Sequence, residues 1–133
     1  HMTAAGLILD RSKGMADIFS AGHPRMIHMS RDQESRLVDL DSGGDVLGIF
    51  DQVVPGVTRL RTSPGDRFLL YSDGLIEHAA NNGNRDLGMH DLLCACTRNL
   101  FTADIQRSVQ AVVQDALAGQ SVQDDIVALG VEV

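Results

Sequence analysis

The chain has 133 residues, a formal net charge of −7, 44% hydrophobic residues and 22% charged residues. These values are typical of a soluble globular domain, or of a large part of one. The lack of a basic run argues against a nucleic-acid partner, and an acidic chain has little attraction for anionic lipid. No apolar run approaches the roughly 18 residues that span a membrane, and no signal peptide is evident, so we expect a cytoplasmic protein without a membrane partner.

The first two thirds of the chain have the pattern of antiparallel strands, because alternating apolar residues are interrupted by frequent turn signals. In the segment over 15–21, Ala16 and Ile18 should face the side opposite to Asp17. The sequence Ser63–Asp66 favours a reversal, since it contains both Pro and Gly. Strands are predicted, in chain order, over residues 5–10, 15–21, 25–30, 36–40, 57–62 and 67–72.

Helical spacing replaces the alternation after Asp73. One helix is predicted over 89–100, and a second over 103–118, with Thr102 as its N-cap and an apolar stripe along one side. A last strand is predicted over 125–133. Several strands followed by two helices and one more strand predict an α+β fold, with an antiparallel sheet covered by helices.

The two cysteines, Cys94 and Cys96, lie two positions apart, so on a helix they point to different faces. A disulfide between them is therefore disfavoured, and zinc binding normally needs four well-placed ligands. We interpret both as small buried side chains in a reducing compartment.

Carboxylates stand at the ends of two apolar strands. Asp73 directly follows the predicted strand over 67–72, while Asp124 and Asp125 directly precede the last strand. If these two strands are neighbours, Asp73 and Asp124 come within reach of one cation. Mg²⁺ and Mn²⁺ prefer such oxygen ligands and can activate water for attack on a phosphate ester.

The same spacing has a simpler interpretation. Asp73-Gly74 after a strand also suits an ordinary turn, and Asp124-Asp125 before a strand also suits a solvated loop. Under the metal-binding interpretation, Gly74 lets the backbone turn sharply and approach a ligand. From the spacing alone, both interpretations stay open.

Five segments resemble, in order, motifs of the metal-dependent protein phosphatase (PPM) family, and of its SpoIIE-like branch most closely. The order and the coverage of nearly the whole chain make the resemblance specific. The segments are Ala21-Gly22-His23-Pro24, Val46-Leu47-Gly48-Ile49, the stretch from Pro64 to Glu77 that contains RFLLYSDGLIE, the stretch from Gly83 to Gly88, and Asp124-Asp125-Ile126-Val127.

This resemblance implies an antiparallel β-sandwich of the PPM type flanked by helices, with two bridged Mn²⁺ or Mg²⁺ ions as cofactors. It also implies hydrolysis of phosphoserine or phosphothreonine by metal-bound water. By the same resemblance Asp73 and Asp124 are metal ligands, Asp125 stands next to the ligands, and Gly74 shapes the backbone. Glu77 ends the motif without an assigned role.

The chain also departs from the family pattern. The family's N-terminal half supplies a first Asp motif and an Asp-Gly-His-Gly-type motif whose Asp bridges the two metals, and nothing in this sequence matches either one. We therefore expect residues 3–133 to be the C-terminal part of the domain, with His1-Met2 left from an expression tag. Alone, this part should bind metal weakly and be inactive or weakly active. A divided sandwich would expose sheet edges, so we also expect self-association.

His23 permits two interpretations. An imidazole can donate a proton near neutral pH, which would suit a catalytic acid or a substrate contact. A His before Pro at a strand end is more often packed and hydrogen-bonded, and we favour this structural role.

Two functions follow from the sequence. The first is a part of a larger bacterial signalling phosphatase that acts on a phosphorylated regulatory protein. In SpoIIE-like proteins this substrate is typically an anti-sigma antagonist, and the missing N-terminal half would be a further partner. The second is a non-catalytic phosphatase-fold module that binds a sigma-factor regulator. Asp73 and Asp124 favour the first function, and the missing half favours the second.

Overall fold

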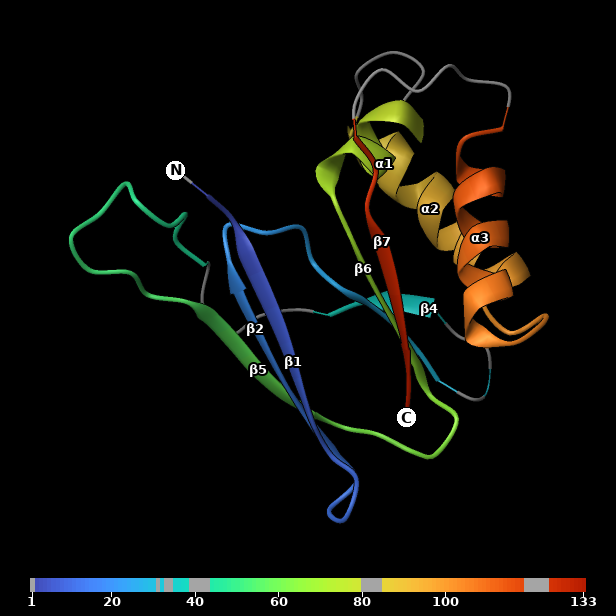
Figure 1. Ribbon diagram of the computed structural model, residues 1–133, viewed down its shortest axis with the longest axis horizontal. Helices are drawn as coiled ribbons and strands as arrows, with labels where there is room; N and C mark the ends of the chain where they lie inside the picture. The colour runs from blue at the N-terminus through green and yellow to red at the C-terminus, as the bar shows by residue number, and fades with distance from the viewer. Residues whose placement is uncertain (1, 31, 33–34, 39–43, 80–84, 119–124) are drawn as a thin grey trace.

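The computed structural model describes residues 2–30, 32, 35–38, 44–79, 85–118 and 125–133 (Figure 1). The order of elements in these residues is several strands, three helices and one final strand. With their bounds, the elements are β1 (Ala4–Asp10), β2 (Met15–Ala21), β3 (Ile27–Met29), β4 (Ser35–Leu37), β5 (Gly56–Arg61), β6 (Arg67–Tyr71), α1 (Asp73–Ala79), α2 (Arg85–Asn99), α3 (Ile105–Ala116) and β7 (Ala128–Glu132).

The described strands form two antiparallel sheets. The first sheet has the order β1-β2-β5, and the second has the order β4-β3-β6-β7. All three helices lie on the side of the second sheet, away from the first (Figure 1). This is the predicted architecture of antiparallel sheets with helices outside, and it confirms the fold class.

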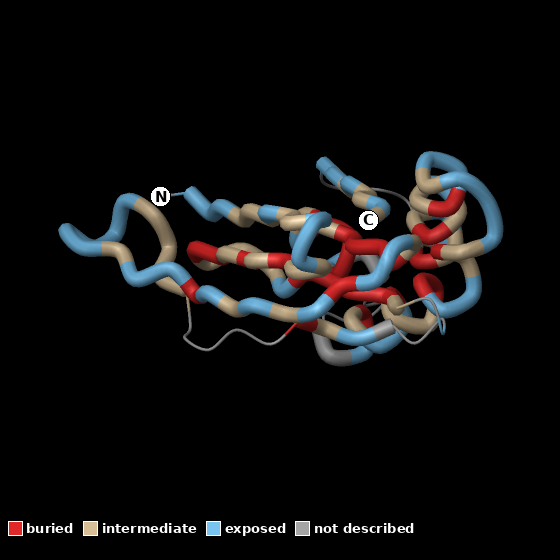
Figure 2. Tube along the Cα trace, turned by 90° about the horizontal axis from the view of Figure 1, so that it is seen from below, coloured by how far each residue is buried: buried red, intermediate tan, exposed pale blue. Residues whose placement is uncertain are grey.

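One apolar core fills the space between the two sheets. Ala16 and Ile18 of β2 are buried, whereas Asp17 between them is half-buried on the other face, as the alternation predicted. They pack with buried Met26, Val38 and Phe68 and with partly buried residues of β1, β5 and β7. Figure 2 shows the buried residues gathered where the layers meet, while the loop between residues 44 and 55 is mostly exposed at one end of the molecule.

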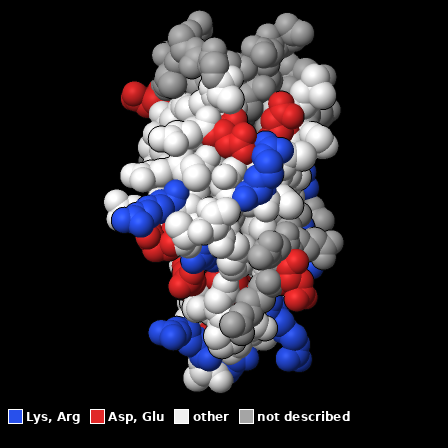
Figure 3. All heavy atoms as spheres, turned by 90° about the vertical axis from the view of Figure 1, so that its right-hand side faces the viewer, with Lys and Arg blue, Asp and Glu red and all other residues white. Residues whose placement is uncertain are grey.

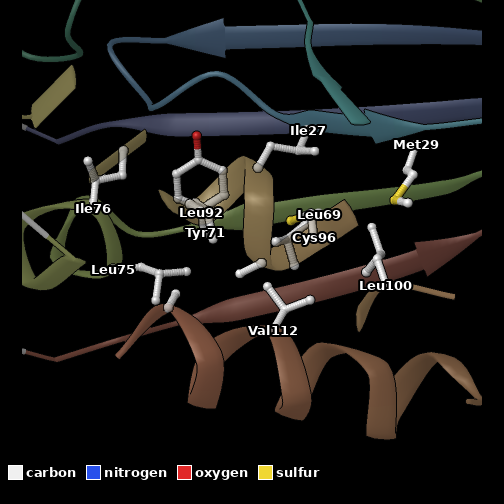
Figure 4. Close-up of a cluster of buried hydrophobic side chains, with 12 residues drawn as sticks. Ile27, Met29, Leu69, Tyr71, Leu75, Ile76, Leu92, Cys96, Leu100 and Val112 are labelled. Carbon is white, nitrogen blue, oxygen red and sulfur yellow. The ribbon is translucent and has the colours of Figure 1, made fainter. Parts of the chain in front are cut away.

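A second core joins the second sheet to the helices (Figure 4). Ile27 and Met29 of β3 contribute to this core, and Val112 of α3 points toward the sheet from the opposite side. Because β6 is buried on both faces, it serves both cores: Phe68 belongs to the first core, and Leu69 and Tyr71 belong to the second. The second sheet is therefore the central layer of the molecule.

Two local predictions about the helices were wrong. The sequence did not predict α1, which begins directly at Asp73. Asp104, rather than Thr102, caps α3, since its Oδ1 accepts a hydrogen bond from the Arg107 amide at 3.0 Å. Thr102 instead donates its hydroxyl to the Asn99 carbonyl at the end of α2, at 2.9 Å.

The exposed surface agrees with the charge pattern of the sequence. On the face over α3, acidic and basic side chains are interspersed (Figure 3). None of the helices in the described part of the chain is long and apolar enough to cross a membrane.

The two cysteines have different environments, as expected from their different helix faces, but the interpretation of both as buried holds only for Cys96. Cys96 is fully buried, and burial raises the pKa of its thiol to about 12, whereas Cys94 is only half-buried. Because the thiolate is the reactive form, iodoacetamide at pH 8 should label Cys94 and leave Cys96 intact in the folded chain. Mass spectrometry of the labelled peptides would show this, and equal labelling of both residues under native conditions would contradict it.

Candidate functional site

The ends of β6 and β7 lie side by side. The two strands pair antiparallel, with Tyr71 opposite Ala128. Beyond the last pair, the Ser72 amide donates to the Val127 carbonyl at 2.9 Å, and the Val127 amide donates to the Ser72 hydroxyl oxygen at 3.0 Å. A shared cation was predicted only if the two strands are neighbours. The pairing of β6 with β7 meets this condition.

Asp73 is an exposed first residue of α1, directly after this junction. Asp125 is also exposed, and its backbone carbonyl accepts a 3.4 Å hydrogen bond from the Ser72 hydroxyl. Asp124 lies outside the described residues. The structure thus brings Asp73 close to the segment that contains Asp125, and the ligand roles of Asp73 and Asp124 stay predictions.

Gly74 is buried in the first turn of α1, and it is not among the glycines with positive φ. The change of direction from β6 to α1 therefore does not require the left-handed backbone that glycine favours. The role of Gly74 is close packing, because a Cβ built on this residue would lie 2.8 Å from the Asp125 carbonyl oxygen. The absence of a side chain lets α1 approach the segment before β7.

Replacing Gly74 with Ala should separate these two segments and lower the free energy of unfolding by about 1–3 kcal/mol, as overpacking does. Urea denaturation of both proteins would measure the change. Gly6→Ala is a matched control, since a Cβ there would meet Phe19 at an ordinary 3.4 Å. An equal loss in the two variants would contradict the packing role of Gly74.

His23 lies at the end of β2, next to the same junction. Its backbone is held by Ser20, whose hydroxyl oxygen accepts from the His23 amide at 3.2 Å and whose hydroxyl group lies 3.0 Å from the His23 carbonyl. The ring Nδ1 lies 3.3 Å from the Thr3 hydroxyl. Burial lowers the pKa of His23, although the Asp73 carboxylate and a hydrogen bond to the Tyr71 backbone act in the opposite direction.

The direction of this shift decides the dominant form of the ring. A His pKa below its ordinary value of about 6.5 means that His23 is mainly the neutral imidazole at pH 7. Protonation then favours the unfolded chain, so His23 costs stability as the pH falls below the unfolded value. A mainly neutral ring is a poor proton donor at pH 7, which supports the structural interpretation of His23.

A cavity of about 370 Å³ opens beside these residues. Its lining includes residues from the segment after β2 and from the start of α1. These two segments belong to two of the sequence motifs, which lie far apart in the chain. Its lining consists of Thr3, Gly22, His23, Pro24, Arg25, Ser72, Asp73, Ile76 and Met89. Three lining residues, Thr3, Arg25 and Met89, were not predicted from the sequence. Of these, only Arg25 had a sequence signal, which is its position directly after the Ala21–Pro24 motif.

A buried polar pair at the other end of β6 was also not predicted from the sequence. His28 Nε2 lies 3.0 Å from Asp66 Oδ2, and both side chains are almost fully buried. The Arg36 Nε–H donates to His28 Nδ1 at 3.3 Å, so we assign the ring proton to Nε2, which donates to Asp66. Asp66 also accepts from the Ser63 amide at 3.0 Å. The pair anchors the turn before β6 and lies away from the cavity.

The donor atoms at the cavity suit a hard cation only in part. Within the described residues, no group of three or more His, Cys, Asp and Glu side chains is arranged to hold a metal ion. Asp73 offers carboxylate oxygens of the kind that Mn²⁺ and Mg²⁺ prefer, and Asp125, whose backbone lies at the same junction, is a second exposed carboxylate. These residues fit one part of a coordination shell, and an octahedral ion needs further ligands.

The family follows from comparison with known proteins. The sequence model of the family described as Stage II sporulation protein E (SpoIIE) matches residues 1–133. The chain belongs to the SpoIIE family. This confirms the resemblance seen in the five sequence segments. No curated protein gives a significant match to the chain.

Solved structures of PPM-type phosphatases share the fold of this SpoIIE-family chain. The structure of the RsbU and RsbW domains of Rv1364c from Mycobacterium tuberculosis has a TM-score of 0.83 at 23% identity, over 96% of this chain and 35% of that one. The phosphatase domain of SpoIIE from Bacillus subtilis, presoaked with Mn, has a TM-score of 0.72 at 22% identity, over 98% and 56%. The catalytic domain of the phosphatase PstP in complex with two manganese ions has a TM-score of 0.62 at 21% identity, over 98% and 59%.

The lengths of these proteins differ from that of this chain. It spans between 35% and 59% of the three similar chains. The likeness therefore establishes the fold of the matched part, and the activity of a whole phosphatase domain is a matter for proposal.

Proposed function

We propose that this chain is part of a bacterial signalling phosphatase that hydrolyses phosphoserine or phosphothreonine on a regulatory protein in the cytoplasm, with Mn²⁺ or Mg²⁺ as cofactor. The observation that carries the proposal is the junction of β6 and β7, which brings Asp73, in the lining of a cavity, close to the segment that contains Asp125. The manganese in the similar PstP structure supports the cofactor. The RsbU and RsbW domains of the similar mycobacterial protein support a regulatory partner, such as an anti-sigma antagonist.

The residues of this chain would do three things in the reaction. Asp73 and Asp124 would hold the metal, and the pairing of β6 with β7 would fix the distance between them. Gly74 would keep the two segments in contact. The cavity wall, with the mainly neutral His23, would receive the phosphorylated side chain. When bound, the metal supplies positive charge for the phosphoryl oxygens and lowers the pKa of water.

The proposal is tested by phosphopeptide hydrolysis, measured for this chain and for a longer product of the same gene that includes the residues upstream of Thr3. We expect weak or no turnover by the chain alone. In the longer protein we expect turnover that Mn²⁺ restores after EDTA treatment. A longer protein that never hydrolyses the peptide, or that does so equally with and without metal, would contradict the proposal.

The second candidate is a non-catalytic module of the same fold that binds a sigma-factor regulator. The lack of a three-residue metal cluster among the described residues favours it for this chain in isolation. It predicts regulator binding that is unchanged by Mn²⁺ or by Asp73→Asn.

The outer face of the first sheet suggests how this chain meets the rest of a phosphatase domain. Among the described helices none covers this face (Figure 1), and Ile8 and Val57 on it are 59% and 38% exposed. We propose that the missing N-terminal half covers this face, and that the isolated chain self-associates there. Light scattering should show dimers or larger species at high concentration, and Ile8→Lys should shift them toward monomer. A monomer at all concentrations would contradict self-association.

A further inference from the structure

Arg25 gives the cavity a positively charged side chain. It is the only Lys or Arg among the described residues that line the cavity, and it is exposed. Asp73 lines the same cavity with the opposite charge. A ligand that enters the cavity can therefore meet a cationic and an anionic group of the protein at once.

The backbone of Arg25 is held in place from inside the core. The hydroxyl of Tyr71, whose side chain is almost fully buried, donates to the Arg25 carbonyl at 2.7 Å. The same hydroxyl lies 3.6 Å from the sulfur of Met89, another lining residue. Pro24 restricts the chain just before Arg25. Tyr71 precedes Asp73 by two residues on the β6 side of the junction, so one short segment positions both Arg25 and Asp73.

Arg25 also belongs to the cavity lining. Burial raises the pKa of the Tyr71 phenol, and the positive charge of Arg25 acts in the opposite direction. Arg25 therefore combines a backbone carbonyl held by Tyr71 with a charged side chain in the cavity lining.

We infer that Arg25 is the specificity-determining residue of this cavity and that it binds the phosphate of a phosphomonoester. The inference deepens the proposed function and rests on it. A guanidinium presents planar paired N–H donors that match two phosphate oxygens, which a single ammonium cannot do. In a cavity that also contains the Asp73 carboxylate, an anion needs a cationic partner from the protein. Arg25 would hold the phosphate in a fixed orientation next to Asp73.

The test measures how tightly inorganic phosphate and a phosphoserine peptide bind to the full 133-residue chain. Both affinities are determined by NMR titration without metal. Arg25→Gln should weaken both by about tenfold, the effect expected for one charge-assisted contact. Arg25→Lys should recover part of the affinity, because it keeps the charge without the fork. Arg61→Gln removes one positive charge at the far end of β2 and β5 and should leave both affinities unchanged.

Several outcomes would overturn the inference. One is equal weakening by Arg25→Gln and Arg61→Gln, which would show a general charge effect. Another is an unphosphorylated peptide that binds as tightly as the phosphopeptide and depends equally on Arg25, which would show recognition of the peptide and not of phosphate. An Arg25→Gln variant that binds both ligands normally, with a native amide spectrum, would also overturn it.

A separate Mn²⁺ titration of the same chain, set beside the metal-free phosphate titrations, separates this inference from the proposed function. If Mn²⁺ does not bind at Asp73 but phosphate binding depends on Arg25, the metal-dependent function fails and the Arg25 inference stands. If Mn²⁺ binds and phosphate binding ignores Arg25, the inference alone fails.

Discussion

If the longer protein has the proposed activity, replacing Asp73 with Asn should lower its Mn²⁺-dependent phosphopeptide hydrolysis by at least about 100-fold, since loss of a residue that only supports a metal ligand already costs about 10–100-fold. Asn keeps the size of the side chain but loses the negative charge that a divalent cation needs. Asp73 is exposed and begins a short helix, so the fold should tolerate the change. Steady-state kinetics at several Mn²⁺ concentrations would measure the loss, and excess Mn²⁺ should restore part of the rate.

The matched control for this variant is Asp91→Asn. Asp91 is an exposed carboxylate on α2 and lines no part of the cavity. This variant should keep the rate and the Mn²⁺ dependence of the parent protein. An Asp73→Asn protein that is folded and fully active would show that Asp73 does not hold the metal.

Replacing Arg67 with Met should lower the free energy of unfolding by about 3 kcal/mol, the upper end of the cost of removing charge-assisted hydrogen bonds from a buried donor. Arg67 begins β6 and is only 7% exposed. It donates to Glu132 at 2.6 Å and to the Ala103 carbonyl at 3.0 Å, and its guanidinium lies over the Phe101 ring at 4.9 Å. Met fills similar space but removes the donor of the buried Leu100 carbonyl, and it removes the link between the second sheet and the α2–α3 connection.

Arg59→Met is the matched control. Arg59 also pairs with a carboxylate, Asp17, at 2.7 Å, but its side chain is 67% exposed. Exposed pairs contribute roughly 0–1 kcal/mol, so we expect a small change in urea denaturation of this variant. If the two variants lost the same stability, burial of Arg67 would not explain its effect.

Much of the fold could be predicted because its signals are local. The alternation in β2 gave the correct inward face, since a strand buried on one side must repeat every two residues. The turn at Ser63–Asp66 was likewise correct, because the Asp66 amide donates to the Ser63 carbonyl at 3.0 Å. The apolar stripe of α3 correctly placed Val112 in the core.

The errors and omissions arose where contacts between distant segments decide the structure. Gly74 was expected to allow a sharp turn, but the close approach of the Asp125 carbonyl, 51 positions later, was not predicted. Thr102 is a favourable N-cap residue by sequence alone, but its hydroxyl donates to the Asn99 carbonyl at the end of α2. Asp104 caps α3 instead.

Only the part of the candidate site at the ends of β6 and β7 could be predicted from the sequence. Asp73 stood out because a carboxylate directly follows an apolar strand. Arg25 did not stand out, because its place beside Asp73 depends on a contact between distant residues. The Tyr71 hydroxyl donates to the Arg25 carbonyl, and these two residues are 46 positions apart. The buried pair of His28 and Asp66, 38 positions apart, was invisible for the same reason.

The central claim is that the ends of β6 and β7 hold a divalent cation. The most direct measurement is Mn²⁺ titration of the isotope-labelled chain, because bound Mn²⁺ broadens the NMR signals of nearby amides. The claim predicts early, selective loss of the signals of Asp73, Gly74 and Asp125, and no such loss in an Asp73→Asn/Asp124→Asn variant. Uniform broadening, or selective broadening around another group of carboxylates that persists in the variant, would contradict it.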